Sequence, residues 1–221
     1  DVGYQYVCID DCWMRTPHSK DPLQVGPLRD AQGNILPNGH FPDMKGLTAY
    51  IHAKGLKAGI YTSPGPFTCA GFAGSYGHEQ QDVDRFVEWG FDFLKYDWCS
   101  YGRTLKHKPT LEDYKRPYRL MGQILRRAKR DIVFNICQYG MGKVWEWGRE
   151  VGGNSWRTGG DLGFELNRIF EVALRNAAIG KWNGPGGWND PDYIQIGYVG
   201  DARRTGLPRP CPLSPNEQYA F

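Results

Sequence analysis

The sequence lacks the short motifs that identify several common classes of protein. Its 6 cysteines form no CxxC pair and its 5 histidines show no HExxH spacing, which argues against a zinc ribbon, a thioredoxin-type redox site and a zinc protease. No apolar run approaches the ~20 residues that a membrane-spanning helix needs. The net charge is only +3, so the composition demands neither a nucleic-acid partner nor an anionic membrane.

The length of the chain fits a single α/β domain. Its 221 residues are enough to bury a sizeable core. The chain starts at Asp1 without an initiator methionine and runs directly into strand-like sequence. We therefore expect a piece from the middle of a longer protein, in which a signal peptide would not be visible.

Segments with the pattern of strands alternate with segments that have the pattern of helices. Strands are expected at residues 4–9, 56–61, 91–96, 131–137, 154–158 and 186–196. Helices are expected from residue 43 to Gly55, over 78–89, from a capping Thr110 into a helix that Pro117 breaks or kinks, and over 164–179. The alternation predicts a parallel α/β fold, which could be an open doubly wound sheet or a barrel.

Two further expectations concern the segments between these strands. The stretch from residue 14 to residue 42 shows no clean period, and a loop of this length inside a compact domain usually carries function. In the last predicted helix, the apolar residues at helical spacing are expected to face inward. These residues are Leu166, Ile169, Phe170, Ala173, Leu174 and Ala177.

Aspartates stand at the ends of nearly all the predicted strands. The carboxyl ends of parallel strands meet at one face of a barrel, which is where barrel enzymes carry out catalysis. This convergence favours the barrel over the open sheet. The aspartates are Asp10, Asp11, Asp97, Asp161, Asp190 and Asp192.

Clustered carboxylates can hold Mg²⁺, hydrolyse glycosides or bind sugar hydroxyls. The residues beside them are tryptophans and cations, namely Trp13, Trp98, Trp156, Trp188, Lys95 and Arg157. Aromatic walls with cations among the acids suit a neutral sugar better than a metal cage. Taken singly, Asp10 or Asp11 could be a cap, and residues 189–192 could be only a turn. A Mg²⁺-dependent barrel enzyme stays as an alternative, which a chelator would inactivate.

Four motifs together resemble those of glycoside hydrolase family 27, the melibiase-type α-galactosidases and α-N-acetylgalactosaminidases. They are DDCW at residues 10–13, KYDWC at 95–99, NSWRTGGD at 154–161 and GPGGWNDPD at 184–192. They occur in the family's order and span nearly the whole chain. The resemblance implies a retaining glycosidase on a (β/α)8 TIM barrel, followed by an antiparallel β domain, and it implies no cofactor and no metal.

The resemblance also assigns roles to individual residues. It implies that Asp97 is the nucleophile and Asp161 the general acid/base, a carboxylate pair of the kind that a retaining glycosidase requires. The neighbouring Lys95 should keep Asp97 ionised. The family's sugar-binding positions match Asp10, Asp11, Tyr61, Lys95, Arg157 and Asp192.

A disulfide between Cys69 and Cys99 is also implied by the resemblance, with two free thiols as the alternative. A disulfide would staple two loops at the mouth of the barrel and would indicate an oxidising, extracytoplasmic or secreted location.

The chain departs from the family's pattern after the fourth strand. The family often has Cys-Glu-Trp there, whereas this chain has Cys137, Gln138 and Tyr139. This segment shapes the pocket near the substituent at carbon 2, so it bears on the choice between galactose and N-acetylgalactosamine. The sequence GNSWRT at residues 153–158 resembles the plant and microbial branch more than the animal lysosomal branch, which favours galactose. Animal members have a cysteine at position 153, so Cys137 is expected to lack that bridge.

The expected protein is thus about six of the eight strands of a barrel, with residues 1–221 forming a partial catalytic domain. The first strand would precede Asp1, while the last strand and the β domain would follow Phe221. Open barrel edges make activity of this piece alone unexpected.

The expected activity is that of a retaining exo-α-galactosidase acting on terminal α-D-galactosyl residues of oligosaccharides or galactomannan. The alternatives are α-N-acetylgalactosaminidase or β-L-arabinopyranosidase within the family, and a non-catalytic sugar-binding barrel outside it. The expected partner is the α-galactoside substrate, with no nucleic acid and no membrane.

Overall fold

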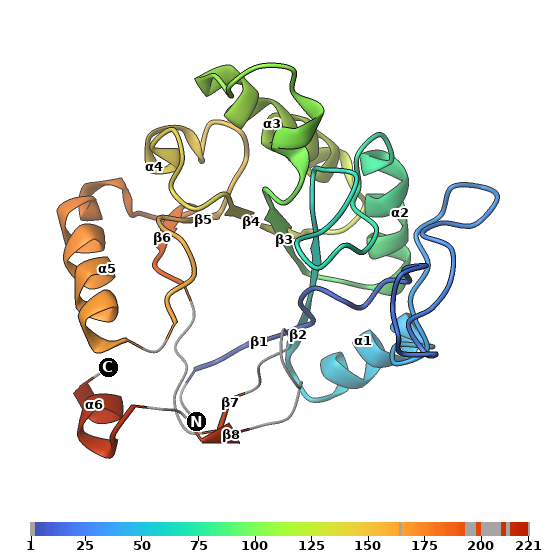
Figure 1. Cartoon of the computed structure of the whole chain (residues 1–221), viewed down its shortest axis with the longest axis horizontal. Coiled ribbons are helices and arrows are strands. Elements are labelled where there is room, and N and C mark those ends of the chain that lie inside the picture. The colour runs from blue at the N-terminus through green and yellow to red at the C-terminus, as the bar shows by residue number, and fades with distance from the viewer. Residues whose placement is uncertain (1–2, 164, 193–197, 200–208, 211–212, 221) are drawn as a thin grey trace.

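Six parallel strands form one sheet whose spatial order, β1-β2-β3-β4-β5-β6, is the order of the sequence (Figure 1). The computed structural model describes residues 3–163, 165–192, 198–199, 209–210 and 213–220. The strands are β1 (Tyr6–Cys8), β2 (Lys57–Thr62), β3 (Phe93–Asp97), β4 (Val133–Cys137), β5 (Ser155–Arg157) and β6 (Trp188–Asp190). A doubly wound sheet reverses its strand order at a switch point, whereas a barrel does not. The barrel expectation is confirmed.

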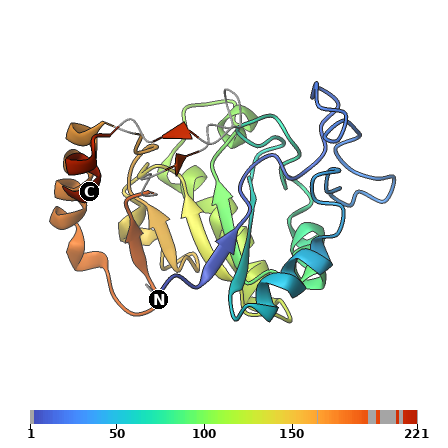
Figure 2. The ribbon, with the colours of Figure 1, turned by 90° about the horizontal axis from the view of Figure 1, so that it is seen from below.

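Helices lie outside the sheet, whose strands run in one direction in Figure 2, and those before residue 180 connect its successive strands. They are α1 (Met44–Ala53), α2 (Glu79–Trp89), α3 (Leu111–Arg127), α4 (Val144–Trp147), α5 (Leu166–Ala178) and α6 (Pro215–Ala220), with 3₁₀ turns η1 (Tyr101–Thr104) and η2 (Gly180–Trp182). A short antiparallel pair, β7 (Tyr198–Val199) and β8 (Arg209–Pro210), is separate. Among the described helices, none combines the length and the apolar character required to cross a membrane.

Local signals in the sequence fix the ends of the helices. The Asp43 carboxylate accepts the Gly46 amide at 2.8 Å and begins α1, and Thr110 forms a reciprocal capping box with Asp113 at the start of α3. Gly90 ends α2 with a φ of 94°, which a residue with a side chain rarely adopts. All six predicted strands are present, although residues 193–196 of the last one lie outside the described residues.

The structure corrects two expectations about the helices. Pro117 does not break α3, which continues through it; in the second turn the ring removes only one backbone hydrogen bond, and it is buried. The alternative, a kink at Pro117, stays a prediction. In α5, Phe170 is 49% exposed and Leu174 73% exposed, and Ala173 and Ala177 are exposed as well. The inward residues of α5 pack against Leu162 and Leu213 in a cluster separate from the main core, so a different face of the helix is covered. Phe164 lies outside the described residues.

The main core lies between the sheet and the helices that cover it. Strand residues with fully buried side chains include Ile60, Leu94, Phe134 and Trp156. Residues 14–42 connect β1 to α1 and are tied down by internal contacts, such as the Asn38 amide to the carbonyl oxygen of Met14 at 2.9 Å. The loop also contacts α2, where Gln81 Nε2 donates to the Gln32 carbonyl at 2.9 Å. Whether it carries function stays a prediction.

Asp92, just before β3, joins three elements at the end of the sheet opposite the strand carboxyl ends. Its carboxylate accepts hydrogen bonds from the Ala58 amide at 2.9 Å and from Arg130 Nη2 at 2.5 Å, and it lies 2.7 Å from His52 Nε2. Burial alone would raise the pKa of Asp92, but these hydrogen bonds outweigh it and hold the pKa below its usual range.

We expect Asp92→Asn to lower the free energy of unfolding by about 1.5–3 kcal/mol near neutral pH, because it removes hydrogen bonds to a charged acceptor. A carboxylate whose folded pKa is depressed stabilises the fold above its unfolded value of about 3.9, and this contribution is lost as the pH falls through the folded value. Urea unfolding between neutral pH and pH ~3 should therefore show the difference from the wild type shrinking with acid. Asp131→Asn, at an exposed carboxylate, is the control; a difference that does not depend on pH would contradict the assignment.

Candidate active site

The predicted site residues come together at the carboxyl ends of the strands. Asp97 is the last residue of β3 and pairs in register with Cys137, the last residue of β4. Tyr61, within β2, pairs with Lys95 in β3. The remaining predicted residues follow the ends of β1, β4, β5 and β6 or close those strands: Asp10, Asp11, Gln138, Tyr139, Arg157, Asp161 and Asp192. The sheet therefore brings together side chains that are up to 182 residues apart in sequence (Asp10 to Asp192).

Asp97 is a buried carboxylate held by two tyrosine hydroxyls. Tyr139 donates a hydrogen bond to its Oδ1, and Tyr61 donates to its Oδ2 at 3.3 Å. Burial raises the pKa of Asp97 more than the Tyr139 hydrogen bond and the charge of Lys95 lower it. The expectation that Lys95 keeps Asp97 ionised is therefore right in direction but incomplete, because burial is the larger influence.

Lys95 makes its ion pair with Asp10 and not with Asp97. Lys95 Nζ lies 2.7 Å from Asp10 Oδ2 and 5.2 Å from the centre of the Tyr61 ring. Asp10 is 63% exposed, so its carboxylate is open to a ligand at the mouth of the barrel. Asp10, which follows β1, reaches Lys95 on β3 because a single strand, β2, lies between β1 and β3 in the sheet.

Asp11 is tied into the loop that carries the disulfide. Its Oδ2 accepts the Ala70 amide at 2.9 Å, and its Oδ1 accepts the Cys12 amide at 2.7 Å. Burial raises the pKa of Asp11 against these hydrogen bonds, which lower it. Asp11 thus fixes the position of residue 70 and, through it, of the loop beside the site.

Arg157 and Asp192 form a buried ion pair of 2.8 Å that supports the turn around Asp161. Arg157 Nη2 also donates to the Gly159 carbonyl at 3.2 Å and to Asp161 Oδ1 at 3.3 Å. Asp192 Oδ2 accepts the amide of Leu162 at 2.6 Å. Asp161 itself has a half-exposed side chain, so the predicted acid/base faces solvent while the ions behind it are buried.

The segment after β4 places its three predicted residues differently. The Cys137 thiol is buried between Asp97 and Arg157, whose Nη1 lies 3.6 Å from its sulfur, and burial raises its pKa well above the usual range. Gln138 is fully buried, and its Nε2 donates to the Met141 carbonyl at 2.8 Å. Tyr139 turns back toward Asp97. A contact of Gln138 with substrate stays a prediction.

The predicted disulfide between Cys69 and Cys99 is present, with a Cα–Cα distance of 4.9 Å. It lies within the site, because Cys99 Sγ is 3.5 Å from the hydroxyl of Tyr61. Among the described residues, Cys69, Cys99 and Asp97 are the one group of at least three His, Cys, Asp or Glu side chains at metal-ligand spacing, within 4.8 Å of one another. Both sulfurs are in the disulfide bond and offer no thiolate, so this group does not fit a metal ion.

Sequence reasoning missed Asn135, which lies inside the barrel on β4. Its Nδ2 donates to Ser155 Oγ at 2.8 Å and to Asp190 Oδ2 at 2.9 Å. Asp190, counted among the site acids, therefore joins β4 to β6, and its other oxygen accepts the Asp192 amide at 2.9 Å. The available signal was an asparagine in the middle of an otherwise apolar strand, since a buried amide needs partners.

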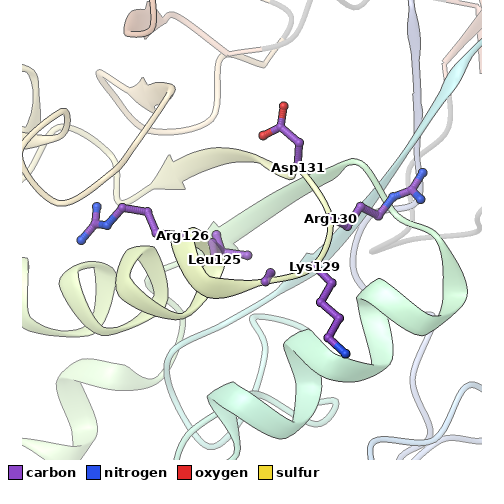
Figure 3. A pocket seen from close by; sticks show the side chains of 6 residues that line it. Leu125, Arg126, Lys129, Arg130 and Asp131 are labelled. Carbon is purple, nitrogen blue, oxygen red and sulfur yellow. The ribbon is translucent and has the colours of Figure 1, made fainter.

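A surface hollow of about 390 Å³ lies elsewhere, between the end of α3 and the start of β4. Figure 3 shows that the cationic side chains of Arg126 and Arg130 point away from each other there. The basic residues at 126, 127, 129 and 130 lie in the last turn of α3 and directly after it, where cations interact favourably with the helix dipole. The hollow is at the end of the sheet opposite the carboxyl ends of the strands.

Comparisons with known proteins relate this chain to one family. A family model described as "Alpha galactosidase A" matches residues 1–206. The α-galactosidase A of Cellvibrio japonicus is 40% identical over 209 residues, covering 89% of this chain and 46% of that protein, and the α-galactosidase of Cyamopsis tetragonoloba is 39% identical, covering 90% and 44%. The structure of the Saccharomyces cerevisiae α-galactosidase with raffinose has a TM-score of 0.72 at 27% identity, covering 90% of this chain and 46% of that one. The chain thus spans about half the length of the curated relatives it matches.

Proposed function

The chain belongs to the α-galactosidase family, glycoside hydrolase family 27, and from this premise we propose that its protein is a retaining exo-α-galactosidase. The proposal rests on one observation above all. A buried carboxylate, Asp97, and a half-exposed one, Asp161, are joined through the side chains of Cys137 and Arg157 at the mouth of the barrel. Two carboxyl groups in different environments are what a retaining mechanism requires, because one attacks while the other transfers a proton.

In the proposed reaction, Asp97 attacks the anomeric carbon while Asp161 protonates the departing glycosidic oxygen. Water then attacks the resulting glycosyl ester and gives a proton to Asp161, so that the product keeps the α configuration. The ion pair of Arg157 with Asp192 holds the turn that carries Asp161, and it would keep the acid at a fixed distance from Asp97.

The galactosyl group would be recognised by the charged groups that face the mouth. Asp10, exposed and paired with Lys95, would accept hydrogen bonds from sugar hydroxyls, and Lys95 would donate to them. Relatives named as α-galactosidases, one of them solved with raffinose, support a galactoside of this kind. The disulfide supports an oxidising, extracytoplasmic location.

The test uses the full-length parent protein and p-nitrophenyl glycosides of three sugars. We expect hydrolysis of the α-galactoside at a kcat/KM at least about tenfold above those of the α-N-acetylgalactosaminide and the β-L-arabinopyranoside, because one wrong or missing group in a pocket costs that much or more. Proton NMR of the first product should show the α anomer, and EDTA should leave the rate unchanged. A higher kcat/KM for either of the other two sugars would assign that sugar as the substrate. A first-formed β anomer would exclude a retaining mechanism, and inhibition by EDTA would favour a metal enzyme.

A further inference from the structure

The two oxygens of the Asp97 carboxylate are held unequally. Oδ1 accepts a close hydrogen bond from the Tyr139 hydroxyl, whereas Tyr61 donates to Oδ2 at 3.3 Å. The Cys137 thiol is a further hydrogen-bond partner of the carboxylate. Tyr139 reaches Oδ1 because β4 ends beside Asp97 and the chain turns immediately afterwards. Of the two tyrosine hydroxyls, the one on Oδ1 is therefore the closer partner, and the one on Oδ2 is the more easily displaced.

Tyr139 is itself held in place from two sides. Its backbone has a φ of 64°, in the left-handed region that residues with side chains seldom occupy. Its hydroxyl lies 3.6 Å from both sulfurs of the Cys69–Cys99 disulfide. The unusual backbone conformation and the contact with the disulfide together restrict the movement of the Tyr139 ring. The family often has tryptophan at this position, so this hydroxyl is not part of the family pattern described above.

We propose that Tyr139 is a positioning residue, which holds Oδ1 of Asp97 so that Oδ2 is the oxygen that attacks the anomeric carbon. The inference rests on the proposed function, which supplies the reaction, and it adds a residue that acts on the reaction through Asp97. The two tyrosines then have separate tasks. Tyr139 holds Oδ1 in place, and the longer hydrogen bond from Tyr61 to Oδ2 breaks when Oδ2 attacks the sugar.

The proposal has a consequence for the two chemical steps. In the first step a lone pair of Oδ2 forms the bond to the anomeric carbon, the glycosidic bond breaks, and the leaving oxygen takes the proton of Asp161. Oδ1 becomes the carbonyl oxygen of the ester. It still accepts the hydrogen bond from Tyr139, but this bond is weaker than before because the acceptor is now neutral. In the second step water attacks, Asp161 takes its proton, and the electron pair of the ester bond returns to Oδ2. Negative charge reappears on the carboxylate, so the Tyr139 bond strengthens and favours this step.

The acidity of Asp97 should depend on the same hydrogen bond. Burial raises its pKa, and Tyr139 provides the largest opposing influence. Loss of the hydroxyl should therefore raise the pKa of Asp97 further. The charged and titratable groups that face Asp97 from the packed elements are Lys95, Asp10, Tyr61, Cys137, Tyr139 and Tyr118.

The test is Tyr139→Phe in the full-length protein, assayed with p-nitrophenyl α-galactoside. We expect kcat to fall by about ten- to a hundredfold, the value of a hydrogen bond to a charged group. KM should fall with it, and a burst of p-nitrophenol should appear, because the glycosyl ester accumulates when its hydrolysis is slowed. The acid limb of kcat/KM, which reports the free enzyme, should move to higher pH. A role in packing alone would produce neither the burst nor the pH shift.

The matched control is Tyr96→Phe, the neighbour of Asp97 on β3. The Tyr96 hydroxyl is buried without a hydrogen-bond partner in the described part of the chain, so its removal should leave the burst and the acid limb as in the wild type. An unchanged acid limb and no burst in Tyr139→Phe would overturn the proposal. If the wild type hydrolyses no α-galactoside, the proposed function fails; a ¹³C NMR titration of Asp97 then still decides the Tyr139 contact, since an equal pKa of Asp97 in wild type and variant refutes it.

Discussion

Removal of the Asp97 side chain, as Asp97→Gly, is expected to reduce hydrolysis of p-nitrophenyl α-galactoside at least about 10³-fold, because no group remains to form the glycosyl ester. Azide should restore release of p-nitrophenol by occupying the emptied space. It would attack from the side where Asp97 stood, so the product should be the β-galactosyl azide. The measurement is the initial rate with and without azide, together with NMR of the product.

Asp161→Ala should give the opposite stereochemistry with the same reagent. We expect about a 10²–10⁴-fold loss, the usual contribution of a general acid/base. Azide needs no base, so it would intercept the glycosyl ester on Asp97 and form the α-galactosyl azide. Asp131→Asn, at an exposed carboxylate remote from the mouth, is the control and should keep full activity. The same azide anomer from both variants would refute the assignment of the two roles.

Replacement of Arg29 by methionine is expected to lower the free energy of unfolding by about 3–5 kcal/mol, since it leaves a buried carboxylate without its partner. Arg29 lies on the long loop between β1 and α1, and its guanidinium contacts both oxygens of Asp82 on α2, at 2.6 and 2.7 Å. Asp82 is 0% exposed. The guanidinium also donates hydrogen bonds to the carbonyl oxygens of Gly33 and Gly74.

Urea unfolding of the full-length protein would measure this loss. The double variant Arg29→Met with Asp82→Leu should recover most of the stability, because replacing both partners of a buried pair by apolar groups is often nearly neutral. Glu88→Gln, which breaks an exposed pair with Arg85, is the control and should change the stability by less than about 1 kcal/mol. If Arg29→Met also lowered the free energy of unfolding by less than about 1 kcal/mol, the ion pair between Arg29 and Asp82 would not be what holds the loop.

The sequence by itself determined the local structure and the candidate site. Alternating patterns placed all six strands, and the caps at Asp43 and Thr110 and the stop at Gly90 set the helix ends. These signals are local, because a cap acts on amides within three residues of it. The four motifs identified the family, and the family pattern implied the disulfide between Cys69 and Cys99 that the structure contains.

The tertiary structure alone decided which side chain meets which. Lys95 pairs with Asp10 across the sheet although Asp97 is nearer in sequence, Arg29 finds Asp82 at a separation of 53 residues, and Tyr139 turns its hydroxyl to Asp97. Phe170 and Leu174 are exposed, despite a spacing that predicts an inward face. The physical reason is common to all of these: strand register and burial fix distances and solvent access, and the strengths of charges and hydrogen bonds depend on both.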